Sequence, residues 1–109
     1  MAVHQFGIMD RPPQTGEVFD RYEPEKYRCI AVGEEAYDQL SRRIGRPLTF
    51  RNGLRLAGCG LNDAGITLID PGTAGDLAGK IRGDSALSPL RTLLFYAHCM
   101  QKWVIHFGI

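Results

Sequence analysis

The residue that most clearly could carry chemistry is His106, which stands in the apolar closing segment KWVIHFGI. An imidazole titrates near neutral pH, so it can serve as a general acid or base, or contact a ligand. Alternation along a strand places His106 on one side with Val104 and Gly108, which we expect to be an open sheet face. The other side would be wholly apolar and packed against helices: Trp103, Ile105, Phe107 and Ile109. A partly buried histidine bonded to a neighbouring loop is the commoner alternative.

The remaining histidine and cysteine residues do not form a recognisable metal or nucleophile site. Three cysteines, Cys29, Cys59 and Cys99, are an odd number without CxxC spacing, which indicates a reducing compartment and thus the cytoplasm. His98 and Cys99 are adjacent on a predicted helix and point roughly 100° apart, so they cannot easily share one metal ion. We expect no metal, no cofactor and no activated cysteine.

A second candidate site lies in the early segment 10–27, which contains three prolines and many charges. Long ordered loops in small domains tend to be functional. Phe19, Tyr22 and Tyr27 should pin this loop to the body. It could form a lid that lines a groove with Arg11, Arg21 and Tyr22, or it could be a solvated loop carrying weak ion pairs.

The elements that position these residues follow from periodicity and punctuation. Strands are predicted at 3–9, 27–32, 47–51, 65–69 and 103–107, and helices at 34–45, 70–83 and 88–101. Asp70 and Ser88, each followed by proline, are the predicted N-caps of the last two helices. Asn52-Gly53 either closes a two-residue hairpin or belongs to an irregular glycine-rich connection.

This order predicts an α+β fold with a ferredoxin-like, split βαβ antiparallel sheet and helices packed on one face. The last strand would then lie beside strand 27–32. The segment 3–9 would add as an extra N-terminal edge strand next to the last one. Its triplet Phe-Gly-Ile, aligned with the same triplet of the last strand, places Phe6 and Ile8 toward the helices, and Gln5 and Gly7 beside His106. An alternative is another α+β order with a separate hairpin ribbon.

Composition sets limits on partners. The chain has 109 residues, 13 lysines and arginines and 12 aspartates and glutamates, a net charge of +1, and fits a single domain, 1–109. Such a balance gives no electrostatic reason to expect nucleic acid or a membrane surface, and the last strand lacks an RNA-stacking motif. No stretch is long and apolar enough to span a bilayer, and the start is no signal peptide.

Three segments, GIMDRPPQTGEVFDRYEPEKYRCIAV, GITLID and KWVIHFGI, resemble a family of small bacterial proteins of about this length and of unknown function. The resemblance covers most of the chain, and LAGCGLNDAG departs from it. It implies no activity, so no functional residues carry over.

From the residues we expect a small, non-enzymatic domain that binds a ligand or a protein and forms a homodimer. A small anionic ligand would bind between the early loop and the sheet edge. The expected contacts are Arg11, Tyr22, Arg28, His106 and Gln5. The first alternative is a small enzyme that uses His106 as general base on an anionic substrate. The second is an immunity-type protein that neutralises a partner.

Overall fold

The computed structural model describes residues 3–108 and contains one antiparallel sheet of six strands with three α-helices. The predicted α+β class is therefore confirmed. The strands are β1 (Val3–Ile8), β2 (Ile30–Gly33), β3 (Leu48–Arg51), β4 (Ala57–Cys59), β5 (Ile66–Ile69) and β6 (Val104–Phe107). The helices are α1 (Glu34–Ile44), α2 (Pro71–Lys80) and α3 (Ser88–Cys99), with short 3-10 turns η1 (Pro24–Tyr27) and η2 (Ser85–Leu87).

The strand order is β2-β1-β6-β5-β3-β4, which differs from the ferredoxin-like order expected from the sequence. β6 pairs with β1 and β5, so the prediction that the last strand lies beside β2 is wrong. The cause lies between β5 and β6, where the ferredoxin-like pattern has one helix and this chain has the two predicted helices, packed on each other. One helix would carry the chain to the far end of the sheet, whereas an antiparallel helix pair returns it to the end where β5 finished.

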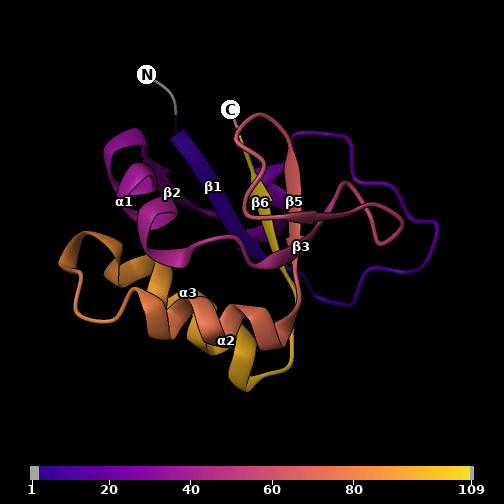
Figure 1. Ribbon diagram of the computed structural model, residues 1–109. Helices are drawn as coiled ribbons and strands as arrows, with labels where there is room; N and C mark the ends of the chain where they lie inside the picture. The colour runs from indigo at the N-terminus through magenta and orange to yellow at the C-terminus, as the bar shows by residue number, and fades with distance from the viewer. Residues whose placement is uncertain (1–2, 109) are drawn as a thin grey trace.

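The first strand does lie next to the last one, as predicted, but it is not an edge strand. β1 pairs with β6 on one side and with β2 on the other, which leaves β2 and β4 as the edges. In Figure 1 the indigo β1 and the yellow β6 run through the middle of the molecule. The first and last strands therefore lie side by side inside the sheet, and neither is an edge strand.

The Asn52-Gly53 segment belongs to a hairpin with a longer turn than predicted. β3 pairs with β4 in the register Phe50↔Ala57, so five residues, 52–56, connect the strands. Asn52 adopts a positive φ of 61°, which asparagine tolerates better than most residues. The sequence signal marked the turn correctly but not its length.

All three helices pack on one face of the sheet, as expected. The core between them is formed by Phe6, Val32, Ile69 and Val104 from the strands and by apolar side chains of α1, α2 and α3. Figure 1 shows α1 at the upper left and α2 and α3 below the strands, while the early loop lies on the right.

The predicted facing of β6 is wrong by one residue. Val104 and His106 face the helices, whereas Ile105 and Phe107 face the early loop. In the antiparallel register Phe6 lies opposite His106, and Gln5 lies opposite Phe107, so Gln5 and Gly7 do not share a side with His106. The error arose because the more apolar side was assigned to the helices. The loop covers the other face with its own apolar residues, so both sides of β6 are buried.

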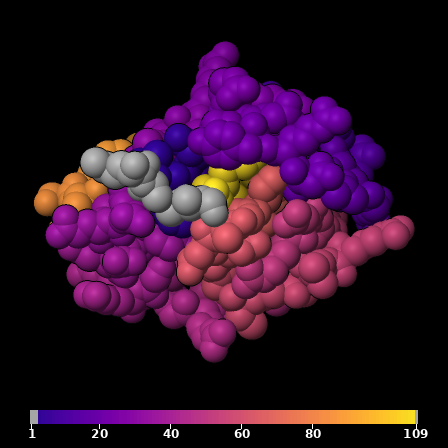
Figure 2. Space-filling view, turned by 90° about the horizontal axis from the view of Figure 1, so that it is seen from above, coloured from indigo at the N-terminus to yellow at the C-terminus, as the bar shows by residue number. Residues whose placement is uncertain are grey.

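The face under the early loop is a second apolar core. Met9, Ile66, Leu68, Ile105 and Phe107 form it, and Phe19 and Tyr27 from the loop pack against it. Tyr22 meets Phe107 edge-on, at a ring-centroid distance of 5.5 Å. The expectation that these three aromatics pin the loop is confirmed. In the end view of Figure 2 the yellow C-terminal atoms show only in a gap between the violet loop and the salmon segment near residue 60.

Candidate functional site

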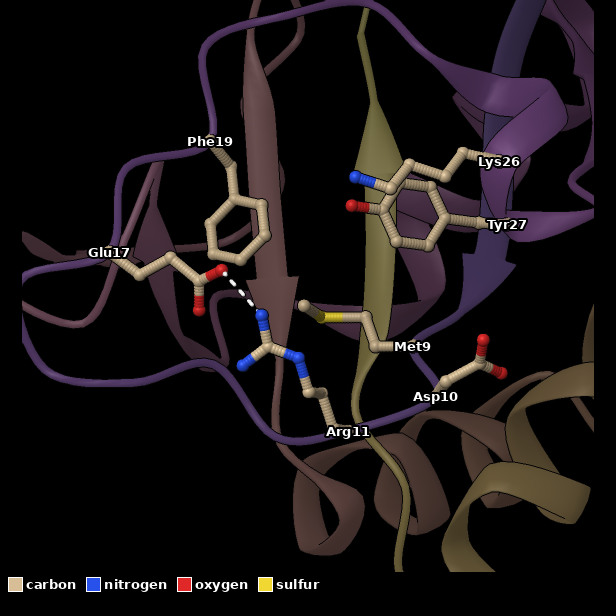
Figure 3. A pocket seen from close by; sticks show the side chains of 7 residues that line it. All are labelled: Met9, Asp10, Arg11, Glu17, Phe19, Lys26 and Tyr27. Atoms are coloured by element: carbon tan, nitrogen blue, oxygen red, sulfur yellow. Dashed lines mark hydrogen bonds and ion pairs between the residues drawn. The ribbon is translucent and has the colours of Figure 1, made fainter.

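Two adjoining cavities lie where the early loop meets the end of β1. The first has a volume of about 140 Å³ and is lined by Met9, Asp10, Arg11, Glu17, Phe19, Lys26 and Tyr27. Figure 3 shows Met9, Phe19 and Tyr27 directed into this cavity. Arg11 and Glu17 form an ion pair of 3.4 Å at its side. The first cavity is therefore an apolar recess with charged groups around it.

The second cavity is larger, about 430 Å³, and carries most of the charge. It is lined by Ile8, Asp10, Lys26, Tyr27, Arg28, Leu93, Tyr96 and Lys102. Three cations and one carboxylate face it, and none of the ion pairs among residues 3–108 involves any of the four. The two cavities share Asp10, Lys26 and Tyr27, so these residues form the wall between them. We call the two cavities together the loop cleft.

The turn η1 positions Lys26, Tyr27 and Arg28 in this cleft. Pro24 starts the turn, where its fixed φ is suited to helical geometry. Arg28 ends it in the left-handed conformation at φ 51°, which costs a non-glycine residue free energy. Its backbone N–H donates to the Pro24 carbonyl. This left-handed residue turns the chain from η1 into β2 beside the second cavity.

The C-terminal end of α3 positions Lys102. The amide of Lys102 donates to the Ala97 carbonyl at 2.8 Å, and that of Gln101 donates to the His98 carbonyl at 3.2 Å. These two bonds, with Gln101 left-handed at φ 55°, form a Schellman motif that uses glutamine where glycine is usual. The motif fixes the direction in which the chain leaves α3, and with it the place of Lys102.

The five ligand contacts predicted from the sequence fall into three places. Arg11 and Arg28 line the loop cleft, one in each cavity. Tyr22 and Gln5 both lie near Phe107, the first through its ring and the second through strand pairing. His106 lies on the helix face of the sheet and has no exposed surface. A substrate from solvent does not reach His106 in this structure, so it is not placed to act as a general base.

Two cations of the cleft were missed in the sequence. Lys26 was one charge among many in the early loop, and Lys102 stood before the last strand with no motif around it. They come together only because β6 returns beside β1, which the predicted strand order did not contain. The proline-started turn at Pro24 is the local signal that could have marked Lys26.

His106 instead belongs to a buried polar chain near the sheet centre. Its Nε2 lies 2.9 Å from His4 Nδ1, and its Nδ1 lies 3.2 Å from the Thr67 hydroxyl. The Thr67 hydroxyl oxygen accepts a hydrogen bond from the backbone N–H of Asn62, so the hydroxyl proton of Thr67 can point to His106. His106 then carries its proton on Nε2 and donates it to His4, an assignment that uses each of these donors.

The buried polar network contains two histidines, His4 and His106, and both are neutral. Burial, together with the neighbouring His4, lowers the pKa of His106 to about 3. Burial also lowers the pKa of His4, against the opposing effect of Asp63. The His4 ring stacks on Tyr37 at 3.4 Å, and the Tyr37 hydroxyl donates to Asp63 at 2.7 Å. The network is buried and joins β1, β5 and β6 to α1, which is typical of a structural element.

No cysteine of the described segment is visibly activated. Burial raises the pKa of the half-buried Cys29 thiol to about 11, while Cys59 and Cys99 are exposed. Within residues 3–108 no three His, Cys, Asp or Glu side chains gather closely enough to hold a metal ion.

Comparison of the chain with protein-family models, with curated proteins and with solved structures gave no match. The resemblance to a bacterial family therefore stays a prediction. The helices within residues 3–108 are all too short or too polar to cross a membrane.

Proposed function

We propose that this protein is a binding domain for a small anionic molecule and that the loop cleft is its site. The observation that carries the proposal is the convergence of Lys26, Arg28 and Lys102 on one cavity that holds a single carboxylate, Asp10. Lys26 belongs to η1, Arg28 is the residue that ends η1, and Lys102 lies in the segment between α3 and β6. Like charges brought together repel one another, and a bound anion would relieve that repulsion.

The cleft supports binding better than catalysis. It contains no histidine and no cysteine, and its one tyrosine with a shifted pKa, Tyr27, is held neutral, since burial raises that pKa. The only histidine pair of the described chain is closed off in the helix-side core. An anion could therefore be held by the three cations without a nearby group suited to proton transfer at neutral pH.

The test is calorimetric titration of the protein with acetate, benzoate and phosphate. At least one anion should bind the wild type, and Arg28→Gln and Lys102→Gln should each weaken it roughly five- to tenfold, because each removes about 1 kcal/mol of ion pairing. Arg46→Gln is the matched control, because Arg46 is exposed and lines neither cavity. Equal affinity of all four proteins would refute the proposal, as would the absence of binding by every anion.

A second candidate function is protein binding, with the homodimer as its simplest form. The observation that favours it is the outer side of α3, where the large side chains of Phe95, Tyr96 and Met100 are exposed. Sedimentation equilibrium at tens of micromolar should show a dimer that Phe95→Lys weakens. A monomer under those conditions would remove this candidate. An immunity-type role would require a different protein as the partner.

A further inference from the structure

The loop cleft has three parts of different chemistry, which follow one another in space: the first cavity, the junction and the second cavity. The first cavity is a recess in which Met9, Phe19 and Tyr27 form an apolar wall, and the rest of its lining is charged: Asp10, Arg11, Glu17 and Lys26. Asp10 and Lys26 line both cavities and so stand at their junction. The cations Arg28 and Lys102 line the second cavity only.

The size of the recess matches one aromatic ring. Its volume is about 140 Å³, and an apolar protein cavity of roughly 150 Å³ is known to take up benzene. Two aromatic rings and a thioether line it, and such groups make favourable contacts with a ring in edge or offset geometry. A larger, fused ring system would not fit without movement of the early loop.

The junction holds one carboxylate, Asp10, beside the cation Lys26. Asp10 is exposed and belongs to no ion pair among residues 3–108. A carboxylate beside a site for anions disfavours a simple anion, because like charges repel. It suits a ligand that carries a cation next to its anion.

From these three parts we infer that the ligand is a free aromatic α-amino acid of the size of phenylalanine. Its ring would lie in the recess, its ammonium group beside Asp10, and its carboxylate among Lys26, Arg28 and Lys102. In such a molecule the α-carbon carries the ammonium group, the carboxylate and the arm that bears the ring. One α-carbon at the junction can therefore direct each of the three groups into a different part of the cleft. This inference rests on the proposed function, because the carboxylate of the ligand is the anion that the three cations bind, and it adds a ring and an ammonium group to that ligand.

The test compares four probes by calorimetry: phenylalanine, 3-phenylpropionate without the ammonium group, phenethylamine without the carboxylate, and alanine without the ring. Phenylalanine should bind at least tenfold more tightly than each of the other three. Asp10→Asn should abolish its advantage over 3-phenylpropionate while leaving the affinity for 3-phenylpropionate equal or higher. Phe19→Ala should weaken phenylalanine but not acetate.

The outcomes separate this inference from the proposed function. If 3-phenylpropionate binds as tightly as phenylalanine and Asp10→Asn changes neither, the ligand is a plain aromatic anion, and only the inference is overturned. If phosphate or acetate binds through Arg28 and Lys102 but no aromatic compound binds better, the inference also fails alone. If none of the probes and no other anion binds, both fail. Circular dichroism of each variant shows that a loss of binding does not come from unfolding.

Discussion

His4 Nδ1 and His106 Nε2 lie 2.9 Å apart, although 102 positions separate them in the chain. The bond joins the first strand to the last one inside the helix-side core, with Thr67 of β5 as the next partner. A neutral histidine pair is thus part of what holds the two ends of the chain together.

This pair predicts a loss of stability in mild acid. The folded pKa values of both histidines are lowered by burial, whereas the unfolded chain binds protons near pH 6.5. The unfolded state therefore takes up more protons as the pH falls below about 6.5, and stability decreases by up to about 1.4 kcal/mol per pH unit for each histidine. Urea unfolding between pH 7.5 and 5 measures the slope. His98→Gln, which replaces the third histidine, should retain it, and a flat profile for the wild type would contradict the buried network.

The position of β6 predicts that the C-terminal strand cannot be trimmed. Each residue of β6 pairs with β1 and with β5, and all four are buried. Removal of residues 105–109 would leave β1 and β5 each unpaired on one side and open both cores. We expect the shortened chain to lack a cooperative thermal transition in circular dichroism. A transition within a few degrees of that of the full chain would show that β6 is not the centre of the sheet.

The N-termini of α2 and α3 allow a comparison of two residues that were predicted as N-caps, Asp70 and Ser88. Asp70 accepts a hydrogen bond from the Thr73 amide at 2.8 Å, so Asp70→Ala should cost about 1 kcal/mol of unfolding free energy. Ser88 was also predicted as a cap, but the structure places it inside the helical turn that continues from η2. Ser88→Ala should therefore be neutral or slightly stabilising. Equal losses in the two variants, measured by chemical denaturation, would contradict this difference.

Gly7 of β1 lies in close contact with residues 27–29, at the end of the early loop. A β-carbon there would lie 2.7 Å from both Cys29 Sγ and Tyr27 Cβ, so Gly7→Ala should destabilise the fold by about 1–3 kcal/mol. Gly79 in α2 has open space around it, so Gly79→Ala should instead stabilise by up to about 1 kcal/mol. Denaturant melts of the two variants should move in opposite directions. A stable Gly7→Ala protein would mean that the loop is not packed on β1.

The individual helices and caps could be predicted from the sequence better than the order of the strands in the sheet. The helix around Tyr37, Leu40 and Ile44 and the cap at Asp70 depend on neighbouring residues, and both were identified correctly. The place of β6 depends on how the two predicted helices before it pack, and a pattern of apolar residues does not state in which direction the chain returns. The side of the sheet that His106 faces was predicted wrongly for a similar reason. Alternation along a strand separates its residues into two faces, but it does not tell which face the helices cover.

In the candidate site, too, some residues could be predicted from the sequence and others could not. Arg11 and Arg28 were found because they lie in or beside a long charged loop. Lys102 was missed because its proximity to Arg28 exists only in the folded chain. The burial of His106 could not be read from KWVIHFGI, because its partners His4 and Thr67 lie on other strands.

The central claim is that the loop cleft binds an anion through Lys26, Arg28 and Lys102. The most direct measurement is an amide chemical-shift titration of the wild type and of the Arg28→Gln/Lys102→Gln double variant with benzoate. The account predicts saturable shifts in the wild type that centre on Asp10, residues 26–28 and Lys102, and their loss in the double variant. Shifts that are absent, that spread over the charged surface without saturating, or that persist unchanged in the double variant would contradict it.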